Sequence, residues 1–354
     1  MTQTLLDSPA TGVAADEQLI SVVLPVYNED QNIGPCLRSL WTALQQEPHE
    51  ILVCYDFDGD STLEAIAKMP DCPTTVRLVK NTLGRGVACA LQAGFNAARG
   101  DVIVSTMADM SDPPEGIVAM AERIRRHGAD VVSGSRYMRG GSQTGGPWFK
   151  GMLSRWAGLS LCWIAGFGTH DATNNFRGYS ARFLKRTPVQ SKVGFEVALE
   201  LTVKAHLQGY RVDEVPSSWQ DRTAGQSRFK LLQWLPRYLM WFAQGMLVPC
   251  LIWAVWLATL VAEGVVQGRE ALWTMSSLIR IGSIAGAGLA GIVAVRRLTG
   301  RMRIWHASVP LVVWGAGQWM TFTGSAVAVP LIALAVACAV LCCTTATRRP
   351  NCAR

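Results

Sequence analysis

The chain lacks the sequence features that mark zinc sites and exported proteins. Its ten cysteines include none of the closely spaced pairs that structural zinc sites use, so we expect reduced thiols. Residues 1–18 are small, polar and acidic, and they lack both the basic start and the apolar stretch of a signal peptide. These absences predict a disordered N-terminal tail over residues 1–18, followed by a domain that stays in the cytosol.

Charge is nearly absent from several stretches after Met246, although the whole chain carries a formal net charge of +7. A basic balance suits a partner that carries phosphates or an anionic membrane face. Nucleic acid would suit the same charge, but the sequence has no finger or basic-zipper signature, and its cations cluster beside Trp-rich segments. We therefore expect a membrane partner and no nucleic acid.

The apolar region over residues 246–345 is predicted to be a transmembrane domain. Met246–Val266 and Ser276–Val295 each have the length of one span, and Ala307–Cys343 is nearly twice that length, with Gly324 near its middle. Arginines before the first span, after the second and after the last predict four spans, with both termini and a tail over residues 346–354 in the cytosol. The alternative is three spans with a re-entrant segment. In a bacterium this would be the plasma (inner) membrane.

Short apolar runs alternate with amphipathic stretches from Ile20 onward, which is typical of strands crossed by helices. The predicted strands are Ile20–Pro25, Ile51–Tyr55, Thr75–Lys80, Val102–Thr106 and Val131–Gly134. The predicted helices are Gln31–Gln45, Leu63–Lys68, Gly86–Ala98 and Gly116–Arg126. This order predicts an α/β catalytic domain over residues 19–227 with a mostly parallel, Rossmann-like sheet, in which ligands bind at the carboxyl ends of the strands.

Acidic turns follow three of these strands. Pro25–Glu29 closes the first strand, an Asp56-Phe-Asp-Gly-Asp60 turn follows the second, and Met107–Pro114 follows the fourth. Converging carboxylates can accept hydrogen bonds from a base or ribose, or hold a divalent cation beside a pyrophosphate leaving group. Ordinary turn formation is the alternative for each cluster. An EF-hand is excluded because Ala67 stands where its closing Glu would be. Gly84-Arg-Gly86 is either a phosphate-binding loop or a plain helix start.

Five segments, in this order, resemble one known family: Pro25–Glu29, Asp56–Thr62, Met107–Pro114, Gly134-Ser-Arg-Tyr137 and Asp221–Phe229. They are similar to family 2 glycosyltransferases of GT-A fold, in particular to polyprenyl-phosphate sugar synthases such as dolichol-phosphate mannosyltransferase. The resemblance extends from Ile20 to roughly Leu247. It implies a hexosyltransferase that moves a sugar from a GDP- or UDP-hexose to a polyprenyl or dolichyl phosphate and inverts the anomeric carbon.

The resemblance also implies roles for individual residues. The donor nucleotide sugar would be contacted by Pro25, Tyr27, Glu29, Asp56, Asp58 and Asp109. The acceptor phosphate would be bound by Arg136, Lys150, Ser154, Arg222 and Ser227. A divalent cation, Mg²⁺ or Mn²⁺, would be held by Asp109 with Ser111 or Asp112. The catalytic set would be Asp109, Arg136 and Arg222.

The sequence departs from the family pattern at two positions. Tyr55 stands where the family has the first acidic residue after the second strand, and Met107 replaces the leading Asp of the Asp-x-Asp metal motif. A thioether is a poor ligand for a hard cation. We therefore expect Asp109 to rely on Ser111, Asp112, water or the donor phosphates, and activity that depends less on metal, or not at all, is the alternative.

Two Trp-rich stretches punctuated by cations are predicted to be helices in the membrane interface, over about 147–166 and over 228–245. Their position before the apolar region favours this interpretation. The alternative is a pair of core helices that pack on the sheet.

Further polar residues invite weaker interpretations. Asp171 and Asn174 lie in a polar segment that either contacts a substrate or forms a local turn. Glu200 matches a family carboxylate and is a candidate partner for an arginine such as Arg222, whereas Glu196, one helical turn earlier, is predicted to lie on a solvated helix face. His170 is predicted to be structural.

Two other functions compete with the transferase. A polysaccharide-forming transferase of the same fold would carry a Gln-x-x-Arg-Trp motif, which the segment Gln233–Arg237 lacks. A degenerate membrane-anchored binding protein is favoured only by Tyr55 and Met107. The sequence leaves the sugar, the nucleotide and the oligomeric state open. A homo-oligomer is possible because Gly282, Gly286, Gly288 and Gly291 place small residues on one predicted helix.

Overall fold

The computed structural model describes residues 16–192, 194–221 and 234–247. In chain order the elements are β1 (Asp16–Pro25), α1 (Ile33–Leu44), β2 (His49–Tyr55), α2 (Ser61–Ala67), β3 (Val76–Lys80), α3 (Val87–Ala97), β4 (Gly100–Ser105), α4 (Gly116–Arg125), β5 (Val131–Ser135), β6 (Ser142–Thr144), α5 (Trp148–Trp163), β7 (Arg177–Ser180), α6 (Ala181–Arg186), α7 (Val197–Gln208), β8 (Val212–Pro216) and β9 (Ser218–Gln220). A further helix covers residues 234–247. All five predicted strands and all four predicted helices of the front half are present, with small shifts at their ends.

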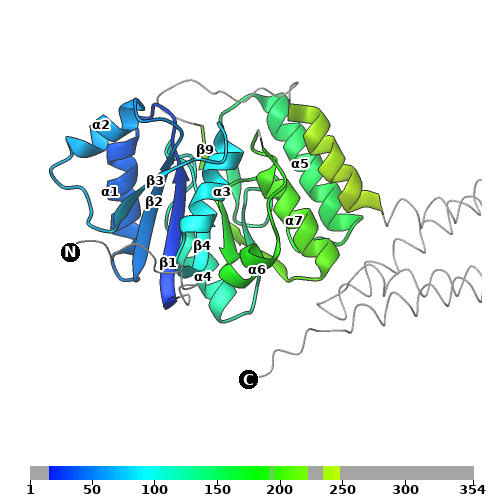
Figure 1. Ribbon diagram of the computed structural model, residues 1–354. Helices are drawn as coiled ribbons and strands as arrows, with labels where there is room; N and C mark the ends of the chain where they lie inside the picture. Colours follow the sequence, from blue (N-terminus) through cyan, green and yellow to red (C-terminus); the bar gives the residue numbers. More distant parts are fainter. Residues whose placement is uncertain (1–15, 193, 222–233, 248–354) are drawn as a thin grey trace, which may run out of the picture. The chain divides into compact units, whose positions relative to one another are not determined.

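The main sheet has the strand order β3-β2-β1-β4-β7-β5-β8. Figure 1 labels β1, β2, β3 and β4 of this sheet. Every pair in it is parallel except those of β7, which runs antiparallel between β4 and β5. The predicted mostly parallel α/β fold is therefore confirmed, and the antiparallel insertion is an addition that the sequence did not predict. Strands β6 and β9 pair separately as a small parallel ribbon.

Alternating side chains of the strands build two apolar layers, one on each face of the sheet. Val22 and Leu24 of β1 pack with α1 and α4, whereas Val23 packs with α3 and α7. The strands β1, β2, β4 and β5 are buried on both faces, as their continuous apolar sequences require in a parallel sheet. This rigid sheet fixes where the loops at its carboxyl edge begin.

The helix over residues 234–247 overlaps the predicted interface helix over 228–245. It buries Trp234 and Trp241 and leaves Leu239 and Met240 exposed. Its Gly245 lies against Leu161 of α5, because a methyl group at residue 245 would come within 2.9 Å of the Leu161 side chain. The two Trp-rich helices thus pack against each other (Figure 1).

No helix within the described ranges is both long and apolar enough to span a bilayer. The predicted transmembrane domain beyond residue 247 lies outside the described residues, as do Arg222 and Ser227.

Helix α3 approaches the sheet so closely that only glycine fits at residue 94. A methyl group there would lie 2.7 Å from Cys54 Sγ and would overlap the Val23 side chain. We therefore expect Gly94→Ala to destabilise the fold by about 1–3 kcal/mol through overpacking. Thermal unfolding of the full chain measures this. The control Asn96→Ala, at an exposed position of the same helix, should leave the midpoint nearly unchanged, and equal midpoints for the two variants would contradict the packing argument.

Candidate active site

The loop after β1 is fastened to the start of α2. Asp60 caps α2 by accepting a hydrogen bond from the Thr62 amide at 2.9 Å, and the same Oδ1 accepts the Asn28 amide at 3.0 Å. The Glu29 amide donates to Thr62 Oγ1 at 2.9 Å. These bonds hold Asn28 at a φ of 52°, a left-handed conformation that is uncommon outside glycine. The predicted donor residues Tyr27 and Glu29 therefore stand on a fixed loop at the carboxyl edge.

Asp56 ties the end of β2 to the loop before α3. Its carboxylate accepts the Asn81 side-chain amide at 2.7 Å and the Gly86 backbone amide at 2.8 Å. The Gly86 amide thus binds Asp56, which supports the plain helix start over a phosphate-binding loop. Asp58, in contrast, is exposed and pairs with Lys80 at 2.6 Å.

The loop after β4 carries the predicted metal residues. Asp109 Oδ1 accepts the Ser111 amide at 3.2 Å, and Met110 between them adopts a φ of 55°. Asp112 is buried, and its Oδ1 accepts hydrogen bonds from the Asn174 side-chain amide at 3.0 Å and from Ser217 Oγ at 2.9 Å. The loop is therefore braced from segments far along the chain, and Asp112 carries much of that bracing.

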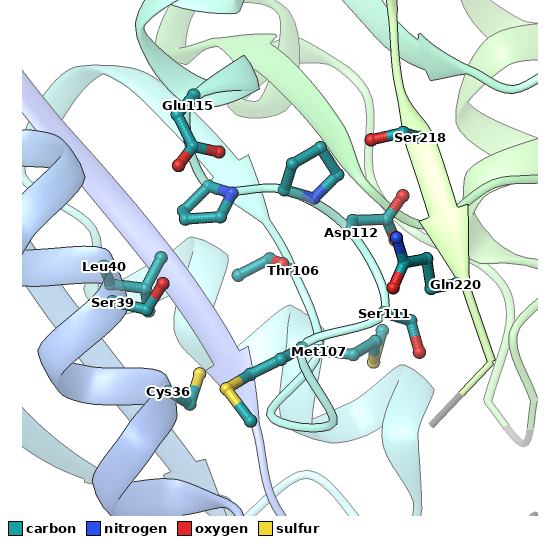
Figure 2. A pocket seen from close by; sticks show the side chains of 13 residues that line it. Cys36, Ser39, Leu40, Thr106, Met107, Ser111, Asp112, Glu115, Ser218 and Gln220 are labelled. Atoms are coloured by element: carbon teal, nitrogen blue, oxygen red, sulfur yellow. The ribbon is translucent and has the colours of Figure 1, made fainter. Parts of the chain in front are cut away.

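A cavity of about 280 Å³ lies between this loop, α1 and β9. Met107 lines it together with Cys36 and Leu40, and in Figure 2 the Met107 and Cys36 side chains lie toward one another. Burial, with smaller contributions from Asp109 and Glu29, raises the pKa of the Cys36 thiol to about 12. The residue that replaces the family's leading Asp thus contributes an apolar side chain to this cavity, beside Cys36 and Leu40.

These groups suit one way of holding a divalent cation. In the described part of the chain no three His, Cys, Asp or Glu side chains are grouped as a metal site. Asp109 and Ser111 are adjacent, whereas Asp112 Oδ1 already accepts two hydrogen bonds. Mg²⁺ commonly binds through one or two carboxylates, with substrate phosphates and water as its other ligands. Asp109 fits that pattern, and a site built from protein side chains alone does not.

Arg136 lies in a buried ion pair with Asp171. Its Nε donates to Asp171 Oδ2 at 2.7 Å and its Nη2 to Oδ1 at 3.0 Å, and Nη2 also reaches Ser154 and Thr173. Burial opposes the charged form, but the charge and hydrogen bonds of Asp171 raise the pKa of Arg136. Asp171 is fully buried, yet Arg136 lowers the pKa of its carboxyl. The pair is therefore ionised and fixed in position.

Ser154 connects this pair to helix α5. Its Oγ accepts from Arg136 and from the Tyr137 hydroxyl, the latter at 2.9 Å, and is 2.6 Å from Thr173 Oγ1. The guanidinium of Arg155 lies 5.8 Å from the centre of the Tyr137 ring. Of the acceptor residues predicted from sequence, the structure thus brings Arg136 and Ser154 into direct contact, while Lys150 lies one helical turn before Ser154 on α5.

Helix α5 turns a large apolar surface outward. Trp148 is 77% exposed and Trp156 is 64% exposed, and Phe149, Met152 and Trp163 are exposed as well. Only Gly158, Leu161 and Cys162 of this helix are buried. The alternative of a core helix is therefore wrong for α5, because most of its aromatic residues are exposed and do not pack on the sheet.

The first residue of β7, Arg177, is a residue that the sequence analysis missed. Arg177 is fully buried and donates to Ser133 Oγ at 3.0 Å, to the Asp171 carbonyl at 2.8 Å and to Thr202. Asn174 bonds Asp112, and Asp171 bonds Arg136, so the polar run that contains them forms the brace between β4, β5 and α5. The only sequence signal was the density of polar residues in an otherwise apolar region.

The structure bears on three further predictions. His170 is structural, as predicted, because its ring lies 2.6 Å from Glu214. Glu200 is bound within the described residues by Lys204 and by the amides of Gln190 and Ser191. The prediction of a solvated face for Glu196 is wrong, since the residue is fully buried beneath the helix over 234–247.

Asp112 gives this site a measurable dependence on pH. Burial raises the pKa of its carboxyl to about 6, although the hydrogen bonds from Asn174 and Ser217 oppose the shift. A raised pKa means that the folded chain binds the proton more tightly than the unfolded chain, so this carboxyl adds stability as pH falls from about 6 toward 4. With divalent ions chelated, Asp112→Asn should unfold at a higher temperature than wild type at pH 7.5 and lose that advantage near pH 5. A constant difference across this range would contradict the assignment.

Comparisons with known proteins place this site in a family. A family model described as "Glycosyl transferase family 2" matches residues 21–187. The dolichol-phosphate mannosyltransferase of Pyrococcus furiosus is 31% identical over 215 residues, which cover 60% of this chain and 59% of that protein's length. The polyprenol monophosphomannose synthase of Mycolicibacterium smegmatis is 31% identical over 246 residues, covering 64% of this chain and 90% of that protein.

Solved structures agree with the fold. The glucosyl-3-phosphoglycerate synthase of Mycobacterium tuberculosis, in complex with UDP, superposes with a TM-score of 0.50 at 17% identity, covering 68% of this chain and 86% of that one. Three observations lead to one conclusion: the order of the motifs, the sheet with its acidic carboxyl edge, and the 31% identity to the polyprenol monophosphomannose synthase of Mycolicibacterium smegmatis over 90% of that protein. This chain belongs to glycosyl transferase family 2.

Proposed function

We propose that this chain is a hexosyltransferase that moves a sugar from a nucleotide-sugar donor to a polyprenyl phosphate at the cytosolic face of a membrane. The observation that carries the proposal is the placement of Asp109 and Arg136. The former lies on the loop after β4, the latter follows β5, and Arg136 is bonded to the outward-facing, Trp-rich helix α5. An anionic leaving group and a lipid phosphate would meet between these two elements.

The relatives' names support the acceptor more firmly than the sugar. Two are mannosyltransferases or mannose synthases that act on dolichol phosphate or polyprenol, and a third is the undecaprenyl-phosphate 4-deoxy-4-formamido-L-arabinose transferase of Serratia proteamaculans, 28% identical. These names share a polyprenyl carrier and differ in the sugar. We infer the same class of acceptor for this chain and leave the hexose and its nucleotide, GDP or UDP, undefined.

The donor would occupy the carboxyl edge above β1 and β2. Tyr27, with 46% of its surface exposed, and Phe57 lie with ring centres 5.6 Å apart at the ends of these strands. Glu29 stands on the same fixed loop. When bound, a divalent cation would neutralise charge on the leaving diphosphate. Asp109 would hold it, with Ser111 beside it and the donor phosphates as further ligands.

The acceptor would approach from the membrane side. The exposed rings of α5 suit the headgroup region of a bilayer, where aromatic side chains are favoured and neighbouring cations such as Lys150 and Arg155 meet lipid phosphates. We propose that the apolar region after residue 247 forms the predicted spans and keeps both termini cytosolic. The lipid phosphate would then reach Arg136 along α5.

The chemistry requires positioning more than activation. A phosphate monoester has a second pKa of about 6, so the acceptor is already anionic at neutral pH and attacks the sugar C1 without a strong base. Arg136, fixed by Asp171, would orient the attacking oxygen, and Asp109 would hold the cation that offsets charge on the departing nucleoside diphosphate. A single displacement breaks the bond between C1 and the diphosphate, forms the bond to the lipid phosphate and inverts C1.

We expect Asp109→Ala to lower the rate of sugar transfer by about 10²–10³-fold, because it removes the carboxylate that would hold the cation offsetting charge at the leaving group. The assay uses membranes containing the full chain, a panel of UDP- and GDP-sugars and undecaprenyl or dolichyl phosphate. Glu122→Ala, on the exposed face of α4, is the control and should keep full activity. If folded wild-type protein labels no lipid with any donor, the proposed function is wrong.

Met107 allows a gain-of-function test of metal use. Met107→Asp supplies the second carboxylate that the family motif contains, so the concentration of Mg²⁺ or Mn²⁺ that gives half-maximal activity should fall by about tenfold, equivalent to 1.4 kcal/mol. Met107→Leu preserves the apolar wall and should behave as wild type. Identical metal titrations for Met107→Asp and wild type would show that residue 107 does not face the cation.

A further inference from the structure

Glu196 is a buried carboxylate whose hydrogen-bonding capacity is unmet by the described part of the chain. It precedes α7, is 0% exposed, and neither of its oxygens has a hydrogen-bond partner among the residues that the structure describes. Glu200, one turn later on the same helix, is equally buried but accepts the Gln190 amide at 2.6 Å, the Ser191 amide at 2.7 Å and the Lys204 ammonium. Glu196 and Glu200 are thus equally buried, but only Glu200 has hydrogen bonds to its carboxylate among the described residues.

The surroundings of Glu196 are supplied by the helix over residues 234–247. Its carboxylate packs over Gly194 beside Trp234, since a methyl group at residue 194 would overlap the carboxylate and lie 3.1 Å from the indole. The ring of Phe195 contacts that of Trp234, with centres 5.4 Å apart. Among the described residues, the cation that approaches it is Arg237, whose Nη1 lies 3.8 Å from Glu196 Oε1.

A buried carboxylate without hydrogen bonds costs stability, and an ion pair at 3.8 Å offsets only part of that cost. Replacement by a neutral side chain would be neutral or favourable for folding alone. The placement therefore calls for a role other than stabilising the fold.

Arg237 is the residue on which Glu196 can act. It is 46% exposed, and its contact with Glu196 is too long for a hydrogen bond, so its N–H groups are not used by that carboxylate. Arg136, by comparison, has its charge offset by Asp171 at 2.7 Å, and most of its N–H groups donate to protein atoms, including Ser154 and Thr173. An incoming phosphate dianion gains more from a cation whose charge is only weakly offset.

The two arginines belong to one neighbourhood. Thr173 accepts a hydrogen bond from Arg136, and Asn175, two residues later, donates at 3.2 Å to the carbonyl of Phe195, the residue before Glu196. In the sequence, the apolar region follows this helix after residue 247. A lipid whose tail lies in the membrane would present its phosphate at this level.

We propose that Arg237 is a further binding residue for the acceptor's phosphate and that Glu196 is its positioning residue, holding the guanidinium toward the site by charge without consuming its donors. This inference rests on the proposed function for the identity of the ligand. It adds a cation contributed by the membrane-proximal helix to the set expected from sequence.

The test measures binding of undecaprenyl phosphate to the full chain in detergent micelles, with the dephosphorylated alcohol as the reference ligand, together with transfer kinetics and thermal unfolding. Arg237→Gln should weaken phosphate-dependent binding about 10- to 100-fold, as expected for loss of a charged hydrogen bond. It should raise KM for the lipid and leave KM for the donor unchanged. Arg237→Lys should recover part of the loss.

Glu196→Gln should weaken binding by about 3- to 10-fold, the cost of ordering a side chain that is no longer held. Its unfolding temperature should equal or exceed that of wild type. The control Glu200→Gln should unfold at a lower temperature, because it breaks a satisfied buried pair. Arg126→Gln, an exposed arginine on α4, should change neither property.

Each outcome separates this inference from the proposed function. If Arg237→Gln and Glu196→Gln bind undecaprenyl phosphate as tightly as wild type, the inference is overturned even when transfer is observed. It is also overturned if Glu196→Gln loses as much thermal stability as Glu200→Gln without any change in lipid binding, or if wild type binds the phosphate and the alcohol equally. Selective binding by wild type with the expected losses, but without sugar transfer, would support the phosphate site while the transferase proposal fails.

Discussion

The buried ion pair between Asp171 and Arg136 is the interaction on which the rest of the site depends. Asp171 binds Arg136 through its two side-chain oxygens, and its backbone carbonyl accepts Arg177 and Ser133. A carboxylate at zero exposure is tolerated only when charge and hydrogen bonds replace water, and Arg136 and the adjacent amides do so here. The cost of leaving any of these groups unpaired fixes the loop after β5, the antiparallel strand β7 and helix α5 in one arrangement.

That arrangement explains how a helix with an outward apolar face can be coupled to a polar site. Ser154 lies on the inner side of α5 and contacts Arg136, Tyr137 and Thr173, while Trp148 and Trp156 face outward. A displacement of α5 would therefore alter the hydrogen bond between Ser154 and Arg136 and shift the Arg136 guanidinium. In the proposed function, a helix that senses the membrane surface and a group that binds the lipid phosphate are parts of one hydrogen-bonded unit.

The donor side is organised differently, by backbone amides more than by ion pairs. Asp60 and Asp56 each accept amide hydrogen bonds and hold neighbouring loops, which leaves Tyr27 and Glu29 at the edge of the sheet. Acidic residues that look alike in the sequence thus differ in role, because Asp56 and Asp60 join neighbouring loops whereas Glu29 accepts a hydrogen bond from nearby Asn32 at 2.7 Å. Met107 changes the metal loop as well, because its apolar side chain lies toward Cys36 where the family motif has a carboxylate. In the proposed function, Asp109 and the donor phosphates would then share the binding of the cation.

The sequence by itself determined the alternation of strands and helices, the acidic carboxyl edge and the family, because these follow from local periodicity and from motifs a few residues long. Only the tertiary structure decided which polar groups form hydrogen bonds and ion pairs with one another. The Arg136–Asp171 pair joins residues 35 positions apart, β7 is too short to leave a pattern, and Glu196 is buried because another helix covers it. Burial and pairing depend on contacts between distant segments, and a single sequence carries no local signal for them.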